Sequence, residues 1–129
     1  MKFSSATQAL YFYCEALITL CHASSADVFC EKIFSFTKGR KVNLHRIDTM
    51  ATVGYYISKL SKTCVFIIGC RYMENMGSVE IAKALNRKQN TKKFYPKLVD
   101  KIHYDNMTEF ELYLTDARMI SNGRKGFEV

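Results

Sequence analysis

A short run in the middle of the chain, residues 64–68 with the sequence CVFII, is apolar at every position. No polar stripe interrupts it, so any fold of this chain has to bury the run on all sides. Its length and its content of valine, isoleucine and phenylalanine are typical of a fully buried β-strand. We therefore predict that a short β-sheet includes residues 63–69.

The segment after this run resembles the strand, glycine turn and helix that open a dinucleotide-binding fold. Gly69 and Gly77 enclose the bulky residues CRYMENM, and the helical pattern SVEIAKAL follows. A Rossmann turn requires the spacing GxGxxG, and a P-loop requires GxxxxGK followed by serine or threonine. Glycines eight residues apart satisfy neither pattern. A nucleotide-binding enzyme is therefore kept as a minor alternative, and a buried strand before a helix capped by Ser78 is preferred.

Helical periodicity marks the N-terminal half of the chain. Residues 9–20 resemble the apolar part of a secretory signal, but Glu15 interrupts them, which a translocating segment would disfavour. We predict an amphipathic, largely buried helix here, with one apolar stripe formed by Leu10, Tyr13, Leu17 and Leu20.

Two more helices are predicted before the apolar run. The first begins with a capping-box-like pair, Ser24 and Asp27, and stops at Gly39. The second is capped by Asp48 or Thr49 and has the sequence MATVGYYISKLSK, in which apolar residues recur at helical spacing.

The C-terminal half is predicted to contain two helices and a hairpin. One helix opens at Ser78 and fades around Asn86, and Thr108 with Glu111 forms a capping box for another. Asn122-Gly123, between two short apolar stretches, is a hairpin signal. The predicted fold class is α+β, a single mostly helical domain over residues 1–129 with a short β-sheet. Its C-terminal β-hairpin gives it a likeness to winged-helix proteins.

Positive charge is the main pointer to function. The chain has 19 lysines and arginines against 12 acidic residues, a formal net charge of +7, which attracts polyanions such as nucleic acid. Seven basic residues fall within 19 positions, residues 83–101, opposed only by Asp100. We predict that nucleic-acid phosphates are bound by Lys83, Arg87, Lys88, Lys92, Lys93, Lys97 and Lys101, together with Arg124 and Lys125 of the hairpin.

The same region resembles a helix-turn-helix, in which a second helix enters the major groove of DNA. The first helix would contain IAKAL, the turn would be NRKQN, and a basic segment would follow, with the hairpin SNGRKG as a wing. Pro96 would break or kink that second segment at its fifth or sixth residue. The helix predicted at residues 50–62 is a rival recognition helix, and both alternatives stay open.

Patterns for catalysis and metal binding are weak. The histidines His22, His45 and His103 are scattered, and no serine or cysteine lies in a motif that would activate it. No CxxC pair occurs, and Cys14 and Cys21 would lie about 10 Å apart on a straight helix, too far to share one zinc ion. We predict a non-enzymatic protein with no metal and no cofactor.

These observations lead to one preferred function and one alternative. The preferred function is a regulatory or accessory protein that binds nucleic acid, DNA in preference to RNA. The alternative is a protein-interaction module that inhibits or adapts a larger partner, because LYFYCEAL and VGYYISKL hold more aromatic rings than one helix stripe buries. A homodimer through the N-terminal aromatic helix fits either function. The odd count of five cysteines predicts a reducing cytoplasmic or nuclear location, and no apolar stretch is long enough to give a membrane partner.

Overall fold

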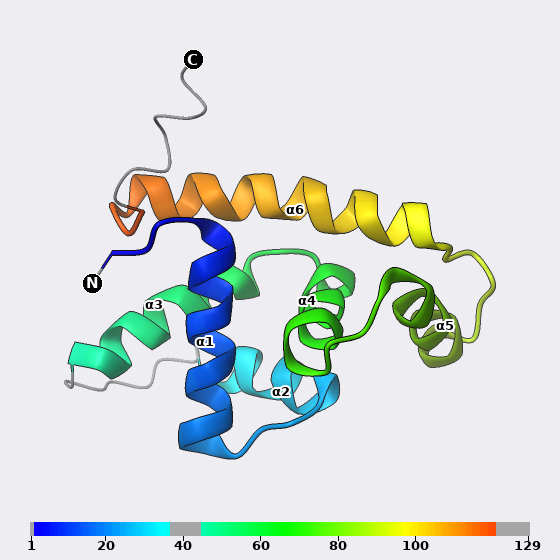
Figure 1. Ribbon diagram of the computed structural model, residues 1–129, viewed down its shortest axis with the longest axis horizontal. Coiled ribbons are helices and arrows are strands. Elements are labelled where there is room, and N and C mark those ends of the chain that lie inside the picture. Colours follow the sequence, from blue (N-terminus) through cyan, green and yellow to red (C-terminus); the bar gives the residue numbers. More distant parts are fainter. Residues whose placement is uncertain (1, 37–44, 121–129) are drawn as a thin grey trace.

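The computed structural model describes residues 2–36 and 45–120, and within these ranges the chain is built from helices (Figure 1). The elements are α1 (Ala6–Cys21), α2 (Ala26–Phe36), α3 (His45–Ser58), α4 (Lys62–Ile68), the π-helix η1 (Gly69–Met73), α5 (Ser78–Gln89) and α6 (Pro96–Asp116). The long helix α6 runs along one edge of the molecule and contacts α1, α3, α4 and α5. The N- and C-terminal ends of the described part meet in an isolated parallel bridge between Phe3 and Ile120.

The predicted α+β class is wrong for the described part of the chain, which contains no strand and no sheet. The run predicted as a strand at residues 63–69 forms α4 and the start of η1. All residues from Cys64 to Cys70 are buried, so the run is enclosed on all sides as expected. A central helix provides that enclosure as well as a strand does, and apolar periodicity cannot distinguish the two in so short a run.

A serine caps the helix that this run forms. The hydroxyl oxygen of Ser61 accepts a hydrogen bond from the backbone N–H of Cys64 at 3.1 Å. The backbone N–H of Ser61 donates to the side-chain oxygen of Asn106 on α6, also at 3.1 Å. Ser61 therefore both caps α4 and ties its first turn to α6.

Gly69 also has a different role from the one that the glycine turn implied. Its backbone is helical, with φ −59° and ψ −45°. A Cβ atom at this position would lie 3.0 Å from the Cα of Ala26 and 3.1 Å from the ring of Phe29. The glycine therefore allows α2 to pack closely against the junction of α4 and η1.

Helix starts in the first half of the chain differ from the predicted caps. Ser25, one residue later than predicted, caps α2, because its hydroxyl oxygen accepts a hydrogen bond from the N–H of Val28 at 3.2 Å. Helix α3 already begins at His45, so the predicted caps Asp48 and Thr49 lie inside it.

Helix α5 also starts and ends at residues other than those predicted. Gly77 is the N-cap, and its N–H donates to the carboxylate of Glu80 at 3.1 Å. Ser78, the predicted cap, is the first helical residue, and its hydroxyl hydrogen-bonds the carboxylate of Asp100. The helix continues to Gln89 and ends at Asn90, whose backbone is left-handed with φ 52°. The predicted polar turn at residues 86–90 is therefore mostly helical.

Helix α6 is one continuous helix where two separate segments were predicted. Pro96 occupies its first turn, where the fixed φ of proline suits a helix and its missing N–H leaves no bond unmade. The predicted capping box at Thr108 is wrong, because this residue lies in mid-helix and its hydroxyl donates to the carbonyl of Tyr104 at 3.1 Å. Hydroxyls inside helices often bond back in this way.

The core of the described residues consists of two hydrophobic clusters. The larger joins α1, α2, α3, α4 and the C-terminal half of α6, and includes Leu10, Tyr13, Phe29, Val53, Val65, Phe110 and Leu114. The smaller lies where α5 meets α4, η1 and the start of α6, and includes Phe66, Ile67, Cys70, Ile81, Leu85, Phe94 and Val99. Ile102 of α6 packs against both clusters.

The predicted hairpin at Asn122-Gly123 lies outside the described residues. Among the helices that are described, none is both long enough and apolar enough to span a bilayer.

Candidate nucleic-acid interface

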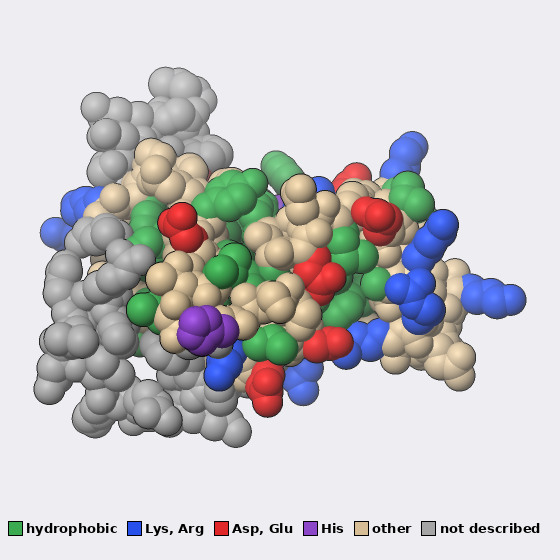
Figure 2. Space-filling view, turned by 60° about the horizontal axis from the view of Figure 1, so that its bottom comes forward, with side chains coloured by type: hydrophobic (Ala, Val, Ile, Leu, Met, Phe, Trp, Pro, Cys, Tyr) green, Lys and Arg blue, Asp and Glu red, His purple; other side chains and the backbone are tan. Residues whose placement is uncertain are grey.

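Six of the predicted phosphate-binding residues lie on α5, on the following loop and on the first turn of α6. All six side chains are exposed, and we call them the basic end: Lys83, Arg87, Lys88, Lys92, Lys93 and Lys97. The surrounding stretch, residues 81–99, contains no acidic residue. Figure 2 shows lysine and arginine side chains protruding from this end of the molecule, on the right of the view.

Two members of the basic end have partners within the described part of the chain. The Nζ atom of Lys88 lies 3.0 Å from a carboxylate oxygen of Asp27 on α2, and 5.2 Å from the ring centre of Phe66. The Nζ atom of Lys93 lies 5.2 Å from the ring centre of Phe94. For the other four, no ion pair with another described residue is found. Those four charges are therefore available to a polyanion.

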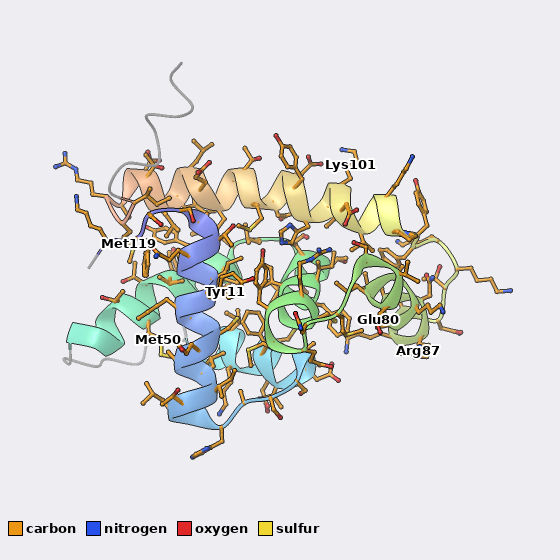
Figure 3. All side chains as sticks on the ribbon, in the orientation of Figure 1. Tyr11, Met50, Glu80, Arg87, Lys101 and Met119 are labelled. Atoms are coloured by element: carbon orange, nitrogen blue, oxygen red, sulfur yellow. The ribbon has the colours of Figure 1, made fainter. Side chains whose placement is uncertain are left out.

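Lys101 does not belong to the basic end. Its Nζ atom is 2.8 Å from a carboxylate oxygen of Asp105, one helical turn further along α6. This hydrogen bond raises the pKa of Lys101 above its usual range, since it favours the charged form. Figure 3 shows Lys101 on the outer side of α6, whereas Arg87 lies on α5. Lys101 therefore differs from Lys97, one helical turn earlier, in that its charge is paired within α6.

The acid that interrupts the basic sequence is neutralised locally. Asp100 lies 3.3 Å from the guanidinium of Arg71 on η1 and accepts a hydrogen bond from Ser78. Arg71 also donates to the hydroxyl of Ser78, at 3.1 Å. Asp100 thus contributes little repulsion to an anion approaching the basic end.

The loop between α5 and α6, residues 90–95, is held by a side chain. Asn86 donates from its Nδ2 to the carbonyl of Phe94 and accepts at its Oδ1 from the N–H of Phe94, both at 3.0 Å. Phe94 itself is buried in the smaller cluster. The loop is longer than the three or four residues that join the helices of a helix-turn-helix. We call these two hydrogen bonds the clamp between Asn86 and Phe94. The sequence did not predict it, because the spacing of the two residues matches no common motif.

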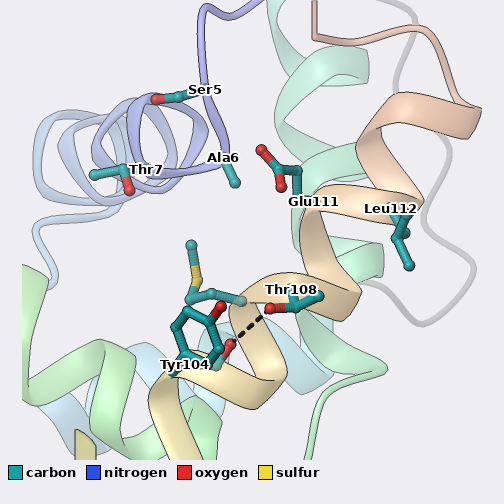
Figure 4. Close-up of a pocket in the computed structure, with 8 residues that line it drawn as sticks. Ser5, Ala6, Thr7, Tyr104, Thr108, Glu111 and Leu112 are labelled. Atoms are coloured by element: carbon teal, nitrogen blue, oxygen red, sulfur yellow. Dashed lines mark hydrogen bonds between the residues drawn. The ribbon is translucent and has the colours of Figure 1, made fainter. Parts of the chain in front are cut away.

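The pockets between the described helices include the following two. One, of about 410 Å³, lies between α2, α4, η1 and α5, and Arg87 and Lys88 line it together with Phe66, Cys70 and Met76. The other, of about 350 Å³, lies between the start of α1 and α6, and Tyr104 and Leu112 are among its lining residues (Figure 4). Only the first shares residues with the basic end.

His103 contacts a tyrosine, and Cys14, Cys64 and Cys70 are buried. The Nε2 atom of His103 lies 3.3 Å from the hydroxyl of Tyr72, and burial, with the charge of Arg71, lowers the pKa of His103. Burial raises the pKa of Cys14, Cys64 and Cys70 to about 12, which keeps these thiols protonated and unreactive. Within residues 2–36 and 45–120, no three His, Cys, Asp or Glu side chains are grouped to hold a metal ion.

Arg124 and Lys125 lie outside the described residues, as does the proposed wing. Comparison of the chain with protein-family models, curated proteins and solved structures gave no match. Function is therefore inferred from the residues of the basic end.

Proposed function

We propose that this protein is a non-enzymatic nucleic-acid-binding protein whose basic end contacts phosphates. The observation that carries the proposal is the concentration of six exposed cations in residues 81–99, a stretch without an acid. Five of the six have no ion pair with a described residue, and only Lys88 has one. An array of this kind gains affinity by releasing the counterions condensed on a nucleic acid.

The position of the cations on the fold supports phosphate contacts over base readout. Arg87 and Lys88 occupy the last turn of α5, where they also balance the negative end of the helix dipole. Lys92 and Lys93 lie on the clamped loop, and Lys97 lies in the first turn of α6, near the positive end of that dipole. These residues come from three adjoining segments, α5, the loop and α6, and are not confined to one helix as the residues of a recognition helix would be.

The proposal predicts a strong dependence on salt. Each phosphate contact contributes about 0.9 to the slope of log affinity against log salt for duplex DNA, and about 0.7 for a single strand. Replacing Lys92 and Lys93 by Glu is expected to abolish binding at moderate salt without unfolding the chain, since both side chains are exposed. Binding is measured by fluorescence anisotropy with duplex and single-stranded DNA at two salt concentrations, and folding by circular dichroism.

A matched control tests whether position or net charge matters. Lys59, just after α3, and Lys62, the first residue of α4, are also exposed, so the variant K59E/K62E changes the net charge equally. We expect this control to retain most of the binding. Unchanged binding in K92E/K93E, or an equal loss in the control, would contradict the proposal.

Exposed apolar residues on α1 favour a second candidate function, protein association. The exposed fractions of Tyr11 and Ile18 are 57% and 47%, and a spacing of seven residues places both on one face of the helix. We propose that this face mediates homodimerisation, and that I18E produces a monomer in sedimentation equilibrium. A wild-type chain that stays monomeric even at high protein concentration would rule out homodimerisation through this face.

A further inference from the structure

One aromatic side chain stands exposed among the cations of the basic end. Tyr95 has an exposed fraction of 56%, and Lys92, Lys93 and Lys97 lie within three residues of it along the chain. Its backbone is extended, with φ −143° and ψ 164°, and it immediately precedes α6. A tyrosine ring in this position offers a flat apolar surface next to phosphate-binding charges.

The loop that carries Tyr95 is fixed at both sides. On one side, the two hydrogen bonds between Asn86 and Phe94 hold the preceding residue, whose ring is buried. On the other side, Pro96 starts α6 with a restricted φ. Because the backbone is already ordered, little conformational entropy is lost when a ligand binds to the ring.

We infer that the basic end binds single-stranded nucleic acid in preference to duplex, with one base stacked on Tyr95. The inference rests on the proposed function and names its substrate class. Bases of a single strand can expose a face to an aromatic side chain, and stacking of this kind is tolerant of sequence. The bases inside a duplex are stacked on one another on both faces, so Tyr95 has no ring to meet there except at a duplex end. The neighbouring lysines then hold the phosphates on either side of the stacked base.

The test compares Tyr95 variants on three fluorescein-labelled probes: a 20-nucleotide oligo(dT), a 20-nucleotide oligo(U) and a 20-base-pair DNA duplex. Wild-type protein is expected to bind the single strands more tightly than the duplex at the same salt concentration. Y95A is expected to weaken single-strand binding by about 5- to 100-fold and to leave duplex binding within about twofold, from the usual contribution of base stacking. Y95F is expected to bind like the wild type.

Two further variants separate stacking from general effects. Tyr104, on α6, is exposed to 72%, so Y104A removes an equally accessible ring away from the basic end and is expected to change nothing. The chain has no tryptophan, so Y95W introduces a single tryptophan, whose emission reports on position 95. The tryptophan emission is expected to be quenched by the two single-stranded probes and to change much less on addition of the duplex.

The outcomes distinguish this inference from the proposed function. Equal losses on all probes in Y95A, or no loss on any, would overturn the stacking role while phosphate binding stands. Wild-type binding that favours the duplex would also overturn it. If the wild type binds none of the probes at low salt, the proposed function is wrong and the inference falls with it. Tighter binding of oligo(dT) or oligo(U) than of the duplex, with a loss of that binding in Y95A, supports the inference.

Discussion

The ring of Tyr13 on α1 lies directly against the backbone of Gly54 on α3. A Cβ atom on Gly54 would be 2.9 Å from both the Cε1 atom and the hydroxyl oxygen of Tyr13, closer than such atoms approach in folded proteins. Tyr13 is fully buried in the larger cluster and also contacts Phe29 edge to face, with ring centres 5.9 Å apart. The glycine therefore determines how closely α1 and α3 can pack.

We expect G54A to destabilise the protein. Overpacking a core costs about 1–3 kcal/mol, which exceeds the gain of up to about 1 kcal/mol when alanine replaces glycine in a helix. The free energy of unfolding, measured by urea denaturation, is expected to fall by about 1–2 kcal/mol. The control is G77S, where an added Cβ meets no atom within 4 Å and serine is a favourable N-cap. A G54A variant as stable as the wild type would show that the Tyr13 ring can move aside.

Removal of the Ser61 cap tests why residues 62–68 are helical. S61A loses the hydrogen bond to the N–H of Cys64 and is expected to lower the free energy of unfolding by about 1 kcal/mol. S61D keeps an acceptor at the same position and should restore most of that stability. Chemical denaturation of the three proteins measures the difference. Equal stability of S61A and wild type would mean that burial alone holds α4 in place.

The strand prediction failed for a physical reason that concerns this same segment. A short apolar run with β-branched and aromatic residues is compatible with a buried strand and with a buried helix, and only the contacts around it decide. Ser61 at the N-cap position was a usable signal in the sequence. The approach of Ala26 to Gly69 was not, because α2 and η1 are far apart in the chain.

Acidification is expected to destabilise the protein through His103. Burial and the charge of Arg71 lower the pKa of His103 below its usual value of 6.5, an effect that Asp100 partly opposes. Burial also raises the pKa of Tyr72, so its hydroxyl keeps a proton that it can donate to the neutral ring. The unfolded chain then binds a proton more readily than the folded chain, and stability is lost as the pH falls below about 6.5.

This pH effect is measured as the urea midpoint between pH 7.5 and pH 5. H103Q cannot take up the proton and is expected to lose less stability over that range than the wild type. The control is H22N, because His22 is exposed and its left-handed backbone, with φ 56°, is one that asparagine tolerates. An equal pH dependence in H103Q and wild type would exclude His103 as the cause.

Asp27 is expected to weaken nucleic-acid binding in the wild-type protein, because its carboxylate forms an ion pair with Lys88. D27N removes this ion pair and one negative charge beside the basic end. Since exposed ion pairs contribute up to about 1 kcal/mol, we expect affinity for nucleic acid to rise by about two- to fivefold at low salt. Fluorescence anisotropy measures the change. D116N, which alters the charge equally at the far end of α6, should have a smaller effect. Weaker binding in D27N would mean that the pair holds Lys88 in its binding position.

The candidate site could be predicted in part. A count of charges along the chain was enough to locate the exposed cations Lys83 to Lys97, because surface lysines seldom depend on the details of packing. The pairing of Lys101 with Asp105 follows from a spacing of four residues and could have been predicted from the sequence. The pairing of Lys88 with Asp27 joins residues 61 positions apart and could not. The presentation of Tyr95 depends on the clamp between Asn86 and Phe94, which becomes recognisable only after α5 and α6 are placed.

The division of the core into two clusters has a consequence for hydrogen exchange. Helix α5 and its loop are anchored mainly by the smaller cluster, through Ile81, Leu85 and Phe94, whereas α1, α2 and α3 share the larger one. Local opening of α5 therefore disrupts few contacts of the larger cluster, and its amides can exchange with solvent while the rest of the protein stays folded. A ligand that binds only the closed form of the basic end would slow exchange in α5 first. Binding of nucleic acid at the basic end would then stabilise the fold of α5 itself.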